Sequence, residues 1–335
     1  MGDVVVGTCS WTDKTMVQAW YPDGVSSAEA RLRYYAERFD AVEVDSAFYA
    51  IPRREYAKAW ARRTPPGFVF HVKAYGMMTG HEVDERTLPA ELRETGYDYV
   101  VTRRGRVRNP EERMVERAFD LFREAIDPLV EAGKMGGVLL QYPPWFTAED
   151  REHRDHNLAH IEQAVALLDP LPVFVEFRHA SWAEPPHLEQ TMRFLADRGL
   201  TFVSVDAPQV ASKTAMPPVI GTTAALGYVR FHGRNHGTWD AKTSTAAERF
   251  DYLYTRDELA EWRAPIEHLA AHTDRTWTMF NNCHYDYAPR NASELASILG
   301  PLVAPRGAGA PTGAPASADH PGTDRPPSGQ LDMGF

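Results

Sequence analysis

The stretch PVFVEFRH, residues 172–179, decides the fold because it joins the pattern of a buried strand to charged side chains. Side chains alternate between the two faces of a strand, so Phe174, Glu176 and Arg178 share one face and the two valines share the other with Phe177. A buried charge without a partner is strongly destabilising. Glu176 and Arg178 must therefore pair with other groups, face solvent or line a functional site.

Seven further stretches have the same character, and segments with helical spacing of apolar residues separate most of them. The strand candidates are VVVGTC (4–9), AVEVDS (41–46), FVFHVKA (68–74), GGVLLQY (136–142), TFVSVDA (201–207), GYVRFHG (227–233) and WTMFNNC (277–283). The clearest helical segments are residues 28–39, 114–132, 187–198 and 256–272. Eight strands alternating with helices predict an α/β fold of the TIM type, a single closed (β/α)8 barrel domain over residues 1–300. An open doubly wound sheet is the alternative, but no GxGxxG motif follows the first strand.

Three segments depart from the regular strand and helix unit. Residues 76–112 are a long polar insertion after the third strand, and with the basic run RRGRVR (103–108) they are a candidate lid or a solvated side excursion. Residues 211–224 carry prolines and a glycine in place of helical periodicity, so we expect an irregular sixth unit. Residues 301–335 are rich in Gly, Pro and Ala, which predicts a disordered tail.

The composition indicates a soluble globular protein that builds its core without disulfides. The 335 residues include only two cysteines, Cys9 and Cys283, which is typical of a reducing compartment. The sequence shows neither a secretory leader pattern nor an apolar run of membrane-spanning length, so we expect a cytoplasmic location and no membrane contact. The formal net charge of −10 argues against a general nucleic-acid coat, although it is compatible with a local basic site.

Polar side chains recur on one face of six of the strands, at the carboxyl end where barrels of this type build their active sites. Alternation assigns these side chains to the inside of the barrel and the valines beside them to the helix side. The converging set is predicted to comprise Glu43, Asp45, His71, Lys73, Gln141, Glu176, Arg178, Asp206, Arg230 and His232, joined from the eighth strand by Asn281 or Asn282. Such a set either closes the barrel as a salt-bridge network or forms a mouth that binds a ligand.

Eight motifs follow one another along most of the chain. They are GTCSW (7–11), YYAERFDAVEVDSAFYAIP (34–52), TPPGFVFHVKA (64–74), LLQYPPWF (139–146), VEFRHASW (175–182), YVRFHGRN (228–235), FDYLYTRDEL (250–259) and FNNCHYDYAPRNA (280–292). In these motifs the chain resembles the YecE-like family, also called domain of unknown function seventy-two. The resemblance implies a TIM-type barrel, in agreement with the strand count, and no established activity. Cys9 and Cys283 depart from the family's usual residues, and because the first and eighth strands of a closed barrel are neighbours, the two thiols are candidates for a close pair.

The charges favour an enzyme of hydrolase or lyase type that applies acid and base chemistry to a small anionic substrate. Three cations are predicted to hold a phosphate or carboxylate group: Lys73, Arg178 and Arg230. The predicted catalytic residues are Glu176 or Asp206 as base and His232 as acid. The other polar residues of the mouth are predicted to bind substrate, and Trp11 to line its wall together with Tyr49, Trp182 and Trp239. No cofactor is predicted for this reaction.

Two other classes of function stay open. A metal-dependent barrel, similar to a phosphodiesterase, an endonuclease or a sugar isomerase, would place a divalent metal ion on Glu176, Asp206, His232 and His71. The neighbouring cations and the lack of a chelating HxH motif disfavour it. A non-catalytic barrel that binds a nucleotide or nucleic acid would have the RRGRVR run as its only positive feature. A Schiff-base role for Lys73 is a further alternative to a salt bridge with Glu43 or Asp45.

Overall fold

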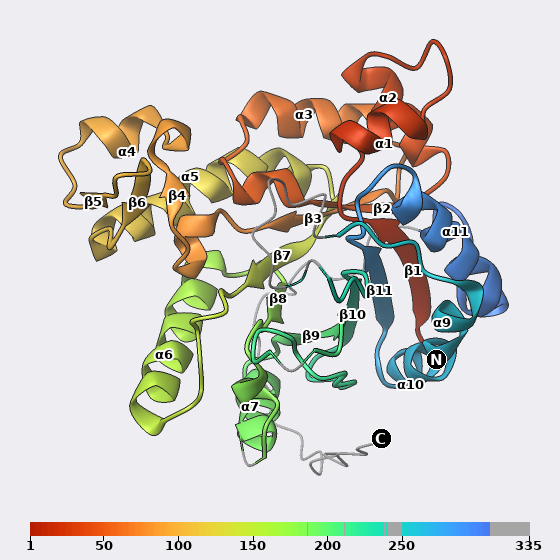
Figure 1. The fold of residues 1–335 in the computed structure, drawn as a ribbon. Helices are drawn as coiled ribbons and strands as arrows, with labels where there is room; N and C mark the ends of the chain where they lie inside the picture. Colours follow the sequence, from red (N-terminus) through yellow and green to blue (C-terminus); the bar gives the residue numbers. More distant parts are fainter. Residues whose placement is uncertain (186, 211, 238, 240–249, 309–335) are drawn as a thin grey trace, which may run out of the picture.

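The eight predicted strands form a closed parallel barrel. The computed structural model describes residues 1–185, 187–210, 212–237, 239 and 250–308, and Figure 1 shows their arrangement. The strands are β1 (Asp3–Thr8), β2 (Ala41–Val44), β3 (Val69–Lys73), β7 (Met135–Gln141), β8 (Val173–Glu176), β9 (Thr201–Asp206), β10 (Leu226–Phe231) and β11 (Arg275–Phe280). Their order around the barrel is β1-β11-β10-β9-β8-β7-β3-β2, and the predicted TIM-type fold is confirmed.

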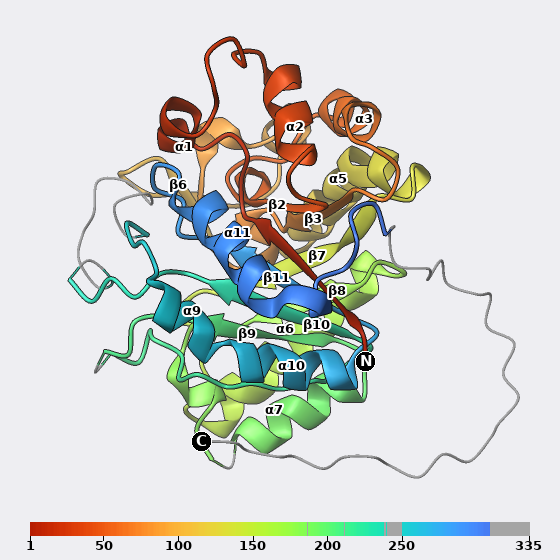
Figure 2. The ribbon, with the colours of Figure 1, turned by 90° about the vertical axis from the view of Figure 1, so that its right-hand side faces the viewer.

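Helices cover the outside of the barrel (Figure 2). Their bounds are α1 Lys14–Ala19, α2 Ala28–Ala36, α3 Arg54–Arg63, α5 Glu112–Glu131, α6 Arg151–Leu168, α7 His187–Ala196, α9 Arg256–Glu261, α10 Arg263–His272 and α11 Tyr287–Leu299. The single helix predicted for residues 256–272 is interrupted at Trp262. Pro265 has no amide hydrogen to donate to the Glu261 carbonyl, which interrupts the helical hydrogen bonds, and α10 begins at Arg263. Among the described residues, no helix is long and apolar enough to cross a membrane.

Apolar side chains of the strands form two separate clusters, as the alternation predicts. One cluster lies between strands and helices and includes Val42, Val175 and Val229. The other takes members from all eight strands and therefore fills the barrel: Val5, Cys9, Ala41, Val69, Leu139, Phe174, Val203, Val205, Tyr228, Trp277 and Met279. The assignment of β9 is wrong, because Val203 and Val205 belong to the interior, which leaves Asp206 on the helix side. Both faces of a barrel strand are covered, so alternation shows which residues share a face but not which face points inward.

The insertion after β3 is a small subdomain beside α5 (Figure 1). It contains α4 (Ala90–Glu94) and an antiparallel sheet of β4 (Val83–Asp84), β6 (Arg106–Arg108) and β5 (Val100–Val101). The run RRGRVR forms the turn between β5 and β6 and then β6 itself. Arg117 of α5 donates to Glu91 of α4 at 2.6 Å, which ties the insertion to the helix layer. Between β9 and β10 the described residues contain no helix, as predicted for the sixth unit.

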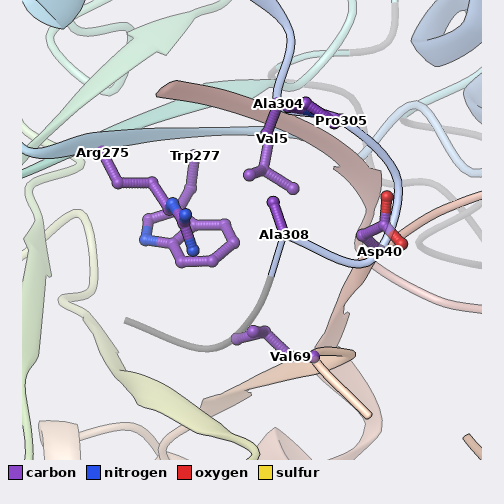
Figure 3. A pocket seen from close by; sticks show the side chains of 9 residues that line it. Val5, Asp40, Val69, Arg275, Trp277, Ala304, Pro305 and Ala308 are labelled. Carbon is purple, nitrogen blue, oxygen red and sulfur yellow. The ribbon is translucent and has the colours of Figure 1, made fainter. Parts of the chain in front are cut away.

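The chain continues to pack on the barrel after residue 300, so the predicted start of the tail at residue 301 is too early. Val303 pairs with Val4, and the Ala304 amide donates to the Val4 carbonyl at 2.8 Å. Residues 304–308 cover the amino ends of the strands and close a hollow against Val5, Val69 and Trp277 (Figure 3). The volume of this hollow is about 10 Å³, room for about one water molecule, so it is too small for a substrate. The remainder of the predicted tail, residues 309–335, lies outside the described residues.

Gly137 on β7 tests how tightly the barrel interior is packed. A methyl group there would lie 2.4 Å from the Phe174 ring and 2.7 Å from the Pro172 carbonyl oxygen, and φ is +144°. We expect Gly137→Ala to lower the free energy of unfolding by on the order of 3 kcal/mol, measured by urea denaturation. Gly237→Ala is the control, because its nearest contact would be Asn235 Oδ1 at 3.6 Å. Equal stability of the two variants would contradict this packing.

Candidate functional site

Arg230 of β10 is the centre of a buried ionic network at the carboxyl end of the barrel. It is fully buried, and its guanidinium donates to both oxygens of Glu43, at 3.1 and 2.6 Å, and to Glu176 Oε2 at 2.5 Å. The Tyr228 hydroxyl also donates to Glu43, at 2.9 Å. Strands β2, β8 and β10 are thus joined across the barrel. The predicted convergence is found, but Arg230 is engaged by carboxylates and does not reach the surface of the mouth.

Glu176 of β8 receives hydrogen bonds on both carboxylate oxygens. Besides the Arg230 contact, Oε1 accepts from Gln141 Nε2 at 2.7 Å and lies 2.9 Å from His232 Nε2. Burial alone would raise the pKa of Glu176, but the charges of Arg230 and Arg178 and the hydrogen bond with His232 hold it well below its usual range. Burial raises the pKa of Glu43 instead, against the opposing charge of Arg230. Glu176 therefore stays ionised in spite of its burial.

His232 is fully buried and uses both ring nitrogens. Nε2 contacts Glu176, and Nδ1 lies 2.9 Å from Asn281 Nδ2. Burial lowers the pKa of His232 to about 4, with Glu176 opposing the shift. The neutral ring with its hydrogen on Nε2 satisfies both contacts, so this histidine orients Glu176 at neutral pH.

Lys73 and Arg178 are the cations nearest the surface of the mouth. Lys73 Nζ donates to Asp45 Oδ1 at 2.9 Å and lies 4.3 Å from the centre of the Phe48 ring. Arg178 lies 3.9 Å from Glu176 Oε1 and 4.9 Å from the centre of the Trp239 ring. The side chains keep 8% and 13% of their surface exposed, and that of Asp45 keeps 24%. Asp45, Lys73 and Arg178 are thus the charged groups of the network that a ligand can approach.

His71 lies deeper in the barrel than predicted. It is fully buried, and its ring contacts Phe174, Tyr228 and Trp277 at centroid distances of 5.3, 5.2 and 4.4 Å. Neither ring nitrogen has a hydrogen-bond partner among the described residues. Burial lowers the pKa of His71 to about 3. His71 is therefore a neutral side chain of the apolar interior and does not line the mouth.

Asp206, Asn282 and Trp11 face the helix layer and not the mouth. Asp206 accepts hydrogen bonds from Arg234 at 2.7 Å, the Tyr254 hydroxyl at 2.6 Å and the Trp262 indole at 2.6 Å. Asn282 donates to the Tyr252 carbonyl and to Asn291, both outside the barrel interior. Trp11 packs against Trp60 and Phe70. Their direction follows from strand parity for Asp206 and Asn282, and from aromatic packing for Trp11.

The predicted set omitted Tyr228, His81 and Trp145. Tyr228 has the same parity as Arg230 and His232, so alternation extended by one step would have included it. His81 and Trp145 come from loops after β3 and β7, where periodicity carries no information about direction.

Neither Trp182 nor His179 joins the mouth: Trp182 stacks on Phe177 at 4.5 Å, and His179 contacts Ser181 at 2.8 Å.

Cys9 lies beside the ionic network, and Cys283 lies on the loop after β11. Arg230 lies 3.7 Å from Cys9 Sγ, and Cys283 packs against the same interior cluster as Cys9. Both cysteines are free, and burial raises the pKa of each thiol well above its usual range. The thiols are neutral and poorly nucleophilic at physiological pH.

The donors of the metal alternative do not converge. Glu176 and His232 are in contact, but Asp206 faces the helix layer and His71 lies in the apolar interior. Within the described part of the chain, no group of three or more His, Cys, Asp or Glu side chains is placed to hold a metal ion.

Comparison with known proteins agrees with this barrel. Residues 5–315 match the family described as "Protein of unknown function DUF72". The chain belongs to the DUF72 family. It is similar to the UPF0759 protein YunF of Bacillus subtilis (strain 168), with 28% identity over 299 residues that cover 88% of this chain and 94% of YunF.

Solved structures of DUF72 family proteins share the fold. One from Thermotoga maritima MSB8 has 28% identity and a TM-score of 0.68, and covers 89% of this chain and 99% of its own. One from Enterococcus faecalis V583 has 23% identity and a TM-score of 0.70, with 88% and 95% covered. The predicted family is confirmed, and its description names no activity.

Removal of Arg230 tests whether the ionic network supports this DUF72 barrel. Arg230→Met leaves Glu43 and Glu176 buried without their shared cation, so we expect the free energy of unfolding to fall by about 3–5 kcal/mol. Arg193→Met, which breaks an exposed pair with Glu189 on α7, should change it by less than about 0.5 kcal/mol. Chemical denaturation of both variants measures the difference. A loss for Arg230→Met as small as that of the control would show that the network contributes little.

The low pKa of His71 predicts a loss of stability in acid. The unfolded chain binds a proton at His71 near its ordinary pKa of 6.5, whereas the folded chain does so only near 3, so stability falls as the pH decreases through this window. His71 accounts for a decrease of about 2 kcal/mol in the free energy of unfolding between pH 7 and pH 5. We expect His71→Leu to lose less stability than the natural sequence over that interval, by denaturation at each pH. His156→Gln, at an exposed position on α6, should follow the natural sequence. An unchanged pH dependence in His71→Leu would refute the prediction.

Proposed function

We propose that this DUF72 barrel is an enzyme that binds a small molecule by its phosphate or carboxylate group at the carboxyl-end mouth, with Lys73 and Arg178 as the anion-binding pair. The observation that carries this proposal is their position above the buried network. Arg230 is engaged by Glu43 and Glu176, whereas Lys73 and Arg178 retain surface at the mouth.

The chemistry of these two side chains supports the proposal. An ammonium group has three N–H donors, and the contact with Asp45 uses one donor of Lys73. A guanidinium group has five N–H donors in a planar fork that matches phosphate and carboxylate oxygens. Strands β3, β7 and β8 are consecutive in the barrel. Lys73 at the end of β3 and Arg178 just after β8 therefore lie on either side of Gln141, which ends β7. An anion between them would gain charge-assisted hydrogen bonds from both sides.

Asp45 is the group we assign to proton transfer with the bound molecule. It is the most exposed carboxylate of the network, with 24% of its side chain accessible, while Glu43 and Glu176 are fully buried. Glu176 and His232 would then act as positioning residues, because both are saturated with contacts and neither reaches the mouth. This assignment is compatible with the hydrolase or lyase chemistry predicted from the sequence.

Anion binding is tested by titration calorimetry of the full-length protein with inorganic phosphate at low ionic strength. Loss of one charge-assisted contact should weaken binding about tenfold or more in Lys73→Met and in Arg178→Met. Lys58→Met, at an exposed position on α3, is the matched control and should bind phosphate as the natural sequence does. Unchanged phosphate affinity in both mouth variants, or equal weakening in the control, would contradict the proposal.

A further inference from the structure

An exposed tryptophan stands beside the mouth, on the loop after β7. Trp145 has 62% of its surface accessible, the largest exposed fraction among the tryptophan side chains of the described residues. Its ring centre lies 5.7 Å from that of His81, and His81 packs edge-on against Phe48 at 4.8 Å. Phe48 in turn lies under Lys73 Nζ. A continuous row of aromatic rings thus leads from Trp145 to Lys73 of the anion-binding pair.

The residues around Trp145 hold its side chain toward solvent. In the run YPPWF the Phe146 amide donates to the Pro143 carbonyl at 2.9 Å, which closes a turn that two prolines restrict. Phe146 is buried and stacks on Tyr142 at a centroid distance of 4.0 Å. The anchored Phe146 therefore holds its neighbour Trp145 on the solvent side. Exposure of so large an apolar ring forgoes the stabilisation that burial would provide, which is typical of a contact surface.

His81 keeps the wall between Trp145 and Lys73 aromatic and uncharged. Burial and the charges of Lys73 and Arg178 lower the pKa of His81 to about 3. Its Nδ1 lies 2.9 Å from the Thr79 hydroxyl, which fixes the ring orientation.

We infer that the ligand of the mouth joins its anionic group to a planar aromatic or heteroaromatic ring, with the ring stacked on Trp145 and the anion on Lys73 and Arg178. The inference rests on the proposed function, because it takes the anion-binding pair as given and names the class of substrate. A free inorganic anion or a sugar phosphate without a planar ring would leave the aromatic row unused.

The test compares the dissociation constants of four probes by calorimetry with the full-length protein: inorganic phosphate, ribose 5-phosphate, phenyl phosphate and adenosine monophosphate. Stacking on an aromatic side chain is worth about tenfold in affinity for each ring. We expect phenyl phosphate or adenosine monophosphate to bind about tenfold more tightly than inorganic phosphate, and ribose 5-phosphate to show no such gain. The stronger of the two ring-bearing probes identifies whether the natural ring is aryl or nucleobase.

Variants of Trp145 separate the ring contact from the anion contact. Trp145→Ala should abolish the gain of the ring-bearing probes and leave the affinity for inorganic phosphate unchanged, while Trp145→Phe should retain most of the gain. Tyr56→Ala removes another exposed ring, on α3 with 53% of its surface accessible, and should have no effect. Thermal melting of each variant verifies folding, which an exposed side chain should not disturb.

The results that would overturn the ring contact differ from those that would overturn the proposed anion binding. Equal affinity for all four probes in the natural protein, or a gain that persists in Trp145→Ala, would overturn the ring contact and leave the anion-binding pair standing. A gain for ribose 5-phosphate as large as that for phenyl phosphate would also overturn it. Absence of binding by every probe would overturn both.

Discussion

The contact on which this barrel mouth depends is the buried guanidinium of Arg230 between Glu43 and Glu176. These three side chains come from β10, β2 and β8, which are not neighbours in the barrel, so the contact spans its interior. Burial would be unfavourable for each charge alone, and only the shared geometry offsets that cost. Gln141 and His232 then satisfy the remaining oxygen of Glu176, which makes the network complete rather than half-paired.

The layer below the network explains why its charges are directed toward the mouth. His71, Phe174 and Trp277 fill the barrel interior with rings, and His71 stays neutral there because a proton would be buried without a partner. Charged groups are therefore excluded from this aromatic layer and gather at the carboxyl end of the strands. Lys73 and Arg178 lie at the outer edge of this charged layer, where aromatic rings from the loops border them.

Strand alternation predicted most of the candidate site because a buried strand repeats every two residues. It correctly placed Glu43, Glu176 and Arg230 together, from three strands far apart in the sequence. It failed at β9, where both faces are apolar enough to be buried and Asp206 finds its partners among Arg234, Tyr254 and Trp262. Those partners come from later loops and helices, whose approach to the strand no periodicity encodes.

The sequence by itself determined the barrel, the family and the convergence of polar side chains at one end, because these follow from periodicity and from ordered motifs. Only the tertiary structure decided which of those side chains are buried in mutual contacts and which can be reached from solvent. It buried Arg230, Glu176 and His232 in mutual contacts, left part of the Asp45, Lys73 and Arg178 side chains accessible, and packed the exposed Trp145 against His81. Depth and exposure depend on how all eight strands and their loops pack at once, and no local pattern of residues contains that information.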